Sequence, residues 1–254
     1  MPLVNSVGHM QWLLHDPARL DLAEDPKTPY AACVDNAKTY AFLEPLYDEV
    51  LSTFQTDCLH IGGDEVTLAG RYPCRSRAKY PTTVAAFTVY VERLHRYLAA
   101  RHVRTGLWAD MMLAPQEASD GRNASTVAEA RKMRSALPKD LLLFDWHYAP
   151  VASYPSGTIL KGAGYGNVIV CTWSDPHNIQ SYARSLAEQR QLGLLQTTWA
   201  GYESSESNLR HEKAQFVAFI IAAEEAWNGG AIAVDHLPYN PDKVFEQAYR
   251  MSID

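Results

Sequence analysis

The amino-acid sequence predicts an α/β fold, namely a (β/α)8 barrel that is incomplete in this chain and shows about six βα units. Short apolar runs alternate with longer stretches of helical periodicity, as in a parallel sheet with crossover helices. Polar and aromatic residues cluster directly after the apolar runs, where a barrel enzyme carries its functional groups. No glycine-rich phosphate loop follows any run, which disfavours the alternative of an open, doubly wound nucleotide-binding sheet.

The predicted strands are continuous apolar runs, which is typical of parallel strands covered on both faces. They comprise residues 3–7, 58–61, 105–108, 141–146, 168–173 and 194–199. A closed barrel of this type has eight strands. Because the first run begins almost at residue 1, we expect the other two strands upstream, and we expect residues 1–254 to form a single barrel domain.

The predicted helices occupy the stretches between these runs. In the first of them, Tyr40, Leu43, Tyr47 and Val50 fall on one apolar stripe, and Asn36 is a suitable N-cap. The helices are expected at residues 36–54, 83–102, 125–137, 179–192 and 210–227. The connection at residues 149–167 is rich in glycine and proline, so we expect a loop with little helix there.

Composition and charge restrict the partners of the chain. The net charge is −6 and lysine and arginine form no basic face, so a nucleic-acid partner is not expected. No window approaches the roughly 18 apolar residues of a membrane span, so we expect no membrane partner. The N-terminus lacks signal-peptide features, which favours the cytoplasm. Of the four cysteines, Cys33 and Cys74 lie in predicted loops, and their pairing stays open.

The chemistry is expected in the stretch Leu-His-Ile-Gly-Gly-Asp-Glu-Val at residues 59–66. An Asp-Glu pair is usually part of a solvated surface. This pair, however, follows a buried strand and two glycines, which let a ligand approach the backbone closely. Neighbouring residues at a strand end point in different directions. Asp64 and Glu65 can therefore reach two different atoms of one ligand.

Residues 60–65 resemble the His-x-Gly-Gly-Asp-Glu signature of glycoside hydrolase family 20, the β-N-acetylhexosaminidases. Residues 5–10, 106–110 and 197–199 are similar to that family's third, fifth and eighth barrel strands. The resemblance implies a retaining exo-enzyme, without metal or cofactor, that hydrolyses terminal N-acetylglucosamine or N-acetylgalactosamine β-glycosides in glycans. In this family the substrate's own acetamido oxygen attacks the anomeric carbon, so the enzyme supplies no nucleophile.

The resemblance also implies roles for single residues. Glu65 would be the general acid and then the general base. Asp64 would hold the acetamido N–H and stabilise the positive charge that develops there. Tyr148 is the candidate partner of the acetamido oxygen, although the family's usual Tyr-Tyr-x-Asp pattern is absent.

Further side chains are expected to complete the sugar pocket. His9 and His60 would tune the acid, and Asp110 would hydrogen-bond the acid or a sugar hydroxyl. Glu203 is the candidate for the outer sugar hydroxyls, with Glu206 as its competitor. Four tryptophans that follow predicted strands are expected to wall the pocket, namely Trp108, Trp146, Trp173 and Trp199.

Two alternatives stay open at this stage. A metal-dependent hydrolase could gather His9, His60 and His147 with the acids, although no His-x-His or His-Glu-x-x-His spacing occurs. A truncated or inactive sugar-binding protein is the second alternative, because no position corresponds to the family's sugar-binding arginine on the first strand. The sequence does not separate gluco- from galacto-configured substrates. A homodimer that covers surface left bare by missing strands is also open.

Overall fold

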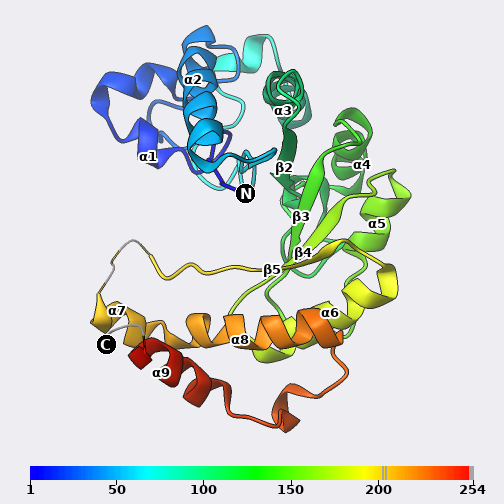
Figure 1. Cartoon of the computed structure of the whole chain (residues 1–254). Coiled ribbons are helices and arrows are strands. Elements are labelled where there is room, and N and C mark those ends of the chain that lie inside the picture. Colours follow the sequence, from blue (N-terminus) through cyan, green and yellow to red (C-terminus); the bar gives the residue numbers. More distant parts are fainter. Residues whose placement is uncertain (202, 204, 252–254) are drawn as a thin grey trace.

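A computed structural model describes residues 1–201, 203 and 205–251, which contain a curled half-barrel of five parallel strands (Figure 1). The strands pair in chain order, so their C-terminal ends lie along one edge of the sheet. They are β1 (Cys58–His60), β2 (Arg104–Trp108), β3 (Leu142–Trp146), β4 (Val168–Thr172) and β5 (Gly193–Gln196). The predicted α/β fold with an incomplete barrel is confirmed.

The first predicted strand, at residues 3–7, is wrong, because only a single bridge from Leu3 to His60 is formed. The backbone N–H groups of Val4 and Ser6 still donate to the carbonyls of His60 and Ile61, at 2.9 and 3.1 Å. The Ser6 hydroxyl donates back to the Val4 carbonyl at 2.7 Å instead of extending the ladder. The segment therefore runs beside β1 as an irregular strip.

Helices that connect the strands pack on the outer side of the curled sheet (Figure 1). Three of the longer ones begin at side-chain caps: Asn36, Thr82 and Asp175 each accept a backbone N–H in the first turn of their helix. The α-helices are α1 (Gln11–Leu14), α2 (Ala37–Phe54), α3 (Thr83–Ala99), α4 (Val127–Ala136), α5 (Ser156–Gly162), α6 (Pro176–Gln189), α7 (Glu206–His211), α8 (Lys213–Asn228) and α9 (Pro241–Met251). Four 3-10 helices are η1 (Pro17–Leu22), η2 (Arg75–Ala78), η3 (Asp110–Met112) and η4 (Val234–His236).

Two predicted segments differ from the structure. The connection at residues 149–167 contains α5, which begins after Pro155 and buries Leu160 in the core. The last predicted helix is two helices, because Ser205 caps α7 and α7 ends at Glu212, where α8 begins. Sequence periodicity missed both features because α5 and α7 are short, with 7 and 6 residues.

Buried tyrosines connect the main core to the strip beside β1. Tyr47 and Tyr90 are fully buried on α2 and α3. The Tyr47 hydroxyl donates to the Ser6 hydroxyl, and the Tyr90 hydroxyl donates to the Ser6 carbonyl at 2.5 Å. Two hydrogen bonds made inside a core hold this strip firmly in place. His9 follows the strip directly, so the core fixes where this histidine enters the site.

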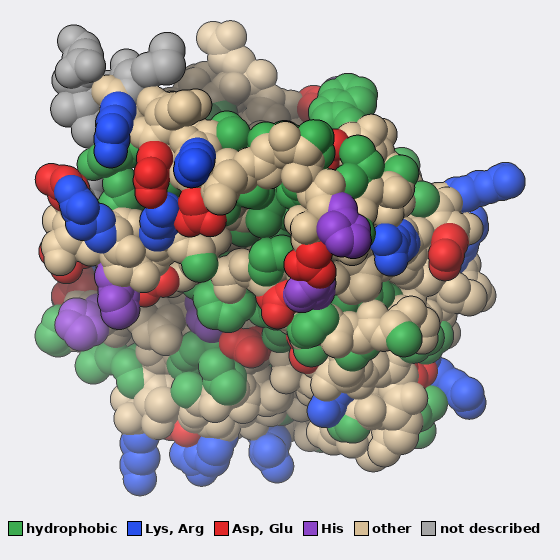
Figure 2. Space-filling model, turned by 90° about the horizontal axis from the view of Figure 1, so that it is seen from below, with side chains coloured by type: hydrophobic (Ala, Val, Ile, Leu, Met, Phe, Trp, Pro, Cys, Tyr) green, Lys and Arg blue, Asp and Glu red, His purple; other side chains and the backbone are tan. Residues whose placement is uncertain are grey.

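On the side that Figure 2 shows, lysine and arginine side chains stand mainly near the edges. Within the described residues, no helix combines the length and apolar character needed to cross a bilayer. All four cysteines are free thiols, and Cys33 is buried.

Candidate active site

A pocket of about 590 Å³ lies where the C-terminal ends of the strands meet the strip beside β1. Seven of the predicted site residues line it, namely His9, Asp64, Glu65, Trp108, Trp146, Tyr148 and Trp199. The strip and α1 add Leu3, Asn5, Gln11 and Trp12. The volume suits a small polar ligand held against aromatic walls.

The turn after β1 sets the two carboxylates apart from the strand. Gly62 and Gly63 have φ values of 77° and 94°, which L side chains rarely adopt. A Cβ on Gly63 would lie 2.5 Å from Leu107 Cδ1, so the turn also needs the missing side chain. Glu65 itself has a φ of 49°. Its backbone N–H donates to Asp110 Oδ2 at 2.9 Å, and this bond supports the unfavourable conformation.

His9 lies between the two carboxylates. Its Nε2 is 3.2 Å from Asp64 Oδ2 and 3.3 Å from Glu65 Oε2. Contact with Asp64, and then with Glu65, raises the pKa of His9 to about 10, although partial burial opposes the rise. The side chain is therefore an imidazolium at neutral pH, and its positive charge lies beside both carboxyl groups.

Asp110 lies behind the acid and is 1% exposed. Burial raises the pKa of Asp110 to about 7, the charge of Asp64 adds to the rise, and hydrogen bonds from Asn123 and Glu65 oppose it. The same Oδ2 that accepts from Glu65 accepts from Asn123 Nδ2 at 2.6 Å. Asp110 thus contacts the backbone of Glu65 and does not line the pocket.

Tyr148 lies among aromatic side chains at the opposite wall. Its ring centroid is 5.0 Å from that of Trp146 and 5.5 Å from that of Trp173. The hydroxyl oxygen accepts from Trp199 Nε1 at 3.1 Å, so its hydrogen is available to a ligand acceptor. Burial raises the pKa of Tyr148, which keeps the phenol protonated.

Besides Asp110, three predicted site residues do not line this pocket. His60 is buried behind Trp108 at a ring distance of 4.6 Å, its Nδ1 accepts the Gly62 N–H at 3.0 Å, and burial lowers its pKa to about 3. Trp173 packs on Tyr148 and donates from Nε1 to Gln215 at 2.7 Å. Both residues therefore support the pocket walls from outside.

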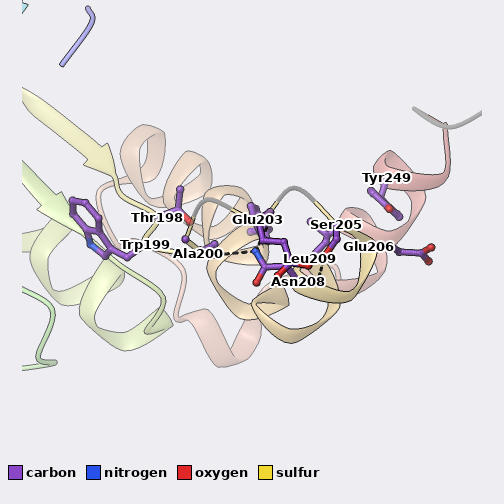
Figure 3. Close-up of a pocket in the computed structure, with 11 residues that line it drawn as sticks. Thr198, Trp199, Ala200, Glu203, Ser205, Glu206, Asn208, Leu209 and Tyr249 are labelled. Carbon is purple, nitrogen blue, oxygen red and sulfur yellow. Dashed lines mark hydrogen bonds between the residues drawn. The ribbon is translucent and has the colours of Figure 1, made fainter. Parts of the chain in front are cut away.

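Glu203 is the third of these residues, and it lines a separate pocket of about 840 Å³ beside α7 (Figure 3). There it accepts a hydrogen bond from Ser205 at 2.8 Å. Its competitor Glu206 lines the same pocket and pairs with Arg210. Trp199 borders both pockets, and in Figure 3 its indole lies at the end away from Glu206.

Sequence reasoning missed several residues that shape the site. Trp12 and Asn5 line the pocket, and the Trp12 indole N–H donates to the Asn5 carbonyl at 3.0 Å. Tyr30 packs edge-on against His9 with ring centroids 5.1 Å apart. Asn123 supports Asp110. Asn5 and Trp12 carried a signal, because they lie in or just after the segment at residues 5–10; Tyr30 and Asn123 come from loops without a motif.

His9, Asp64 and Glu65 also offer the kind of side chains that bind metals. Their ligand atoms all lie within 4.8 Å of one another. A metal ligand must be a neutral imidazole, whereas the pKa of His9 is about 10. A metal ion bound by these three side chains would therefore have to displace the proton of His9.

Comparisons with known proteins agree on one family. The profile "Glycosyl hydrolase family 20, catalytic domain" matches residues 15–229. A β-N-acetylhexosaminidase from Bacteroides fragilis is 18% identical with a TM-score of 0.57, over 100% of this chain and 51% of that chain. An exo β-N-acetylglucosaminidase from Vibrio harveyi, solved with N-acetylglucosamine, is 16% identical with a TM-score of 0.61, over 89% and 38%.

A chitobiase from Flavobacterium johnsoniae is similar in the same way, with 17% identity and a TM-score of 0.53 over 96% of this chain and 43% of that chain. At these identities the likeness concerns the fold. The chain spans about half the length, or less, of these solved structures. No curated protein sequence matches the chain.

Proposed function

The chain belongs to glycosyl hydrolase family 20, and on that premise we propose that its pocket hydrolyses terminal β-linked N-acetylhexosamine residues with retention of configuration. The observation that carries the proposal is the pairing of Asp64 and Glu65 by one imidazolium, His9, in an aromatic-walled pocket. Two carboxylates with different surroundings suit a reaction that needs both a proton donor and a charge-stabilising group.

In the proposed first step the acetamido oxygen of the substrate attacks the anomeric carbon and the glycosidic bond breaks. Glu65 gives its proton to the departing oxygen, so the leaving group departs as an alcohol. Asp64 accepts a hydrogen bond from the acetamido N–H and stabilises the positive charge of the oxazolinium ion. The Tyr148 hydroxyl, whose oxygen already accepts from Trp199, donates to the acetamido oxygen and orients it.

In the proposed second step water attacks the anomeric carbon from the face that the leaving group vacated. Glu65, now a carboxylate, removes the proton from this water and returns to its starting state. The bond to the acetamido oxygen breaks and restores the acetamido group. Because the anomeric carbon is inverted twice, the β configuration is retained.

The aromatic walls support a sugar substrate. Trp108 and Trp199 have ring centroids 6.5 Å apart, and both border the pocket with Trp146. Indole faces pack against the apolar C–H faces of pyranose rings, while the indole edges bind polar groups. We propose that the substrates include both N-acetylglucosamine and N-acetylgalactosamine glycosides.

Incubation of the protein with a chromogenic N-acetyl-β-glucosaminide, with and without a chelator, tests the proposal. We expect release of the chromophore at the same rate in both samples, because the proposed mechanism uses no metal ion. A matched N-acetyl-β-galactosaminide shows whether the 4-hydroxyl is discriminated. Loss of activity with the chelator would support a metal-dependent hydrolase, and binding of N-acetylglucosamine without turnover would support a sugar-binding protein.

A further inference from the structure

The loop between η3 and α4 contacts both sides of the active site. On one side, Asn123 Nδ2 donates to Asp110 Oδ2 at 2.6 Å, and the Asn123 backbone N–H donates to the Asp110 carbonyl at 2.8 Å. The Asp110 carboxylate in turn accepts the backbone N–H of Glu65 at 2.9 Å. Asn123 therefore orients the buried group that holds the backbone of the proposed acid.

Asp120, in the same loop, contacts the other side. Its Oδ2 accepts the backbone N–H groups of Tyr148 and Ala149, at 2.6 and 3.0 Å. Its Oδ1 lies 2.9 Å from His147 Nδ1. Burial alone would raise the pKa of Asp120, but hydrogen bonds from His147 and Tyr148 lower it to about 2. Asp120 is thus a carboxylate, and its hydrogen bonds fix the backbone at Tyr148, the proposed partner of the acetamido oxygen.

Gly121 lets this loop pack directly on the end of β3. Its φ is 55°, and a Cβ there would lie 1.9 Å from the Trp146 carbonyl oxygen. No other residue type fits that approach without displacing the strand end. The loop backbone is therefore fixed against β3, which gives Asp120 and Asn123 a rigid base.

We propose that Asp120 and Asn123 are positioning residues that together set Glu65 and Tyr148 relative to each other, Asn123 through Asp110 and Asp120 through the backbone of Tyr148. The inference rests on the proposed function for the roles of Glu65 and Tyr148. Neither Asp120 nor Asn123 lines the pocket. The reaction needs the acid at the leaving oxygen while the tyrosine holds the acetamido oxygen, and a misplacement of about 1 Å can cost about 100-fold in rate.

The two positioning residues predict different kinetic signatures. Asn123→Ala impairs proton delivery, so kcat should fall about 10- to 100-fold for an alkyl N-acetyl-β-glucosaminide, whose alkoxide must be protonated. For the 2,4-dinitrophenyl glycoside, whose phenolate leaves without a proton, the loss in kcat/KM, which reports the first step, should stay within about 3-fold. Asp120→Ala impairs the positioning of the nucleophile, so kcat should fall by a similar factor, about 10-fold or more, on both substrates.

Two further variants control for a general loss of structure. Asp120→Asn keeps an oxygen that can accept the Tyr148 N–H, and it should restore most of the activity that Asp120→Ala loses. Arg122→Ala removes a neighbouring side chain of the same loop whose Nε donates to the Ser119 carbonyl, at 2.9 Å. Its kinetics should match those of the unaltered protein on both substrates.

Amide hydrogen exchange measured by NMR supplies a readout that needs no turnover. We expect Asn123→Ala to speed exchange at the Glu65 amide alone, and Asp120→Ala to speed it at the Tyr148 and Ala149 amides alone. If this selective pattern occurs in a protein that hydrolyses neither substrate, the proposed function fails and the positioning roles stand. If the protein is active but Asn123→Ala and Asp120→Ala slow both substrates in the same proportion, the positioning roles are overturned. They are also overturned if exchange at the backbone amides of Glu65 and Tyr148 is unchanged in these variants.

Discussion

Replacement of Glu65 by Gln is expected to lower kcat for an alkyl N-acetyl-β-glucosaminide by about 10²- to 10⁴-fold, the usual contribution of a general acid. The amide has nearly the same shape, and the backbone N–H that donates to Asp110 is unchanged, so the effect is chemical. Asp64→Asn should lower kcat by about 10²- to 10³-fold, because a neutral amide stabilises the developing positive charge poorly.

Steady-state kinetics on alkyl and 2,4-dinitrophenyl glycosides measure both effects. The loss in Glu65→Gln should be much smaller for the dinitrophenyl leaving group in the first step, whereas the loss in Asp64→Asn should persist. Glu188→Gln is the matched control, because Glu188 is exposed on α6. A Glu65→Gln protein with an unchanged kcat on the alkyl glycoside would show that another group is the acid.

The second large expected effect is a loss of stability when His147 is replaced. This side chain is 1% exposed. Its Nδ1 is 2.9 Å from Asp120, and its Nε2 is 3.3 Å from Asp145, which is fully buried. His147→Leu removes the cation and leaves these carboxylates without it. We expect unfolding free energy measured in urea to fall by about 3–5 kcal/mol.

The same group predicts a dependence of stability on alkaline pH. Burial opposes protonation of His147, but the charge of Asp145 and the contact with Asp120 raise its pKa to about 9. Because this pKa lies above the ordinary value of 6.5, the stabilisation is fully present below pH 6.5 and is lost as the pH rises through 9. The unaltered protein should therefore lose more stability between pH 7 and pH 10 than His147→Leu does.

A control separates this effect from the titration of other histidines. His177→Leu alters an exposed histidine on α6, and its stability should follow the same pH curve as that of the unaltered protein. His9, whose pKa is also raised, contributes equally to all three proteins. Parallel pH curves for the unaltered protein and His147→Leu would contradict the assignment of a buried imidazolium at position 147.

The parts of the fold that the sequence predicted are those that local patterning determines. The strands β1 to β5 coincide with continuous apolar runs. The helix α2 carries an apolar stripe with the helical period, and Asn36 caps it as predicted. The run at residues 3–7 has the composition of a strand but makes only one bridge. Whether a run becomes a strand depends on its partners, which composition does not report.

The site residues likewise divide into those that a local motif predicts and those that depend on contacts between loops. The carboxylates of Asp64 and Glu65 were found because the motif combines them with the glycines that their turn requires. Asp120 and Asn123 were missed because the partners of their side chains lie 13 to 29 positions away in the sequence. Such contacts arise only when loops meet at the ends of the sheet. Glu203 was predicted from its spacing to Trp199, but its side chain lines the pocket beside α7 and not the pocket that contains Asp64 and Glu65.

The central claim is that the substrate's acetamido oxygen is the nucleophile while Glu65 delivers the proton and Asp64 holds the acetamido N–H. The most direct test measures kcat/KM for aryl glucosaminides whose N-acetyl group carries zero, one, two or three fluorine atoms. Fluorine withdraws electron density from the acetamido oxygen without changing the leaving group, so the account predicts a steady fall in kcat/KM through the series. Values that do not change with fluorination would contradict the account and would assign the nucleophile to the enzyme or to water.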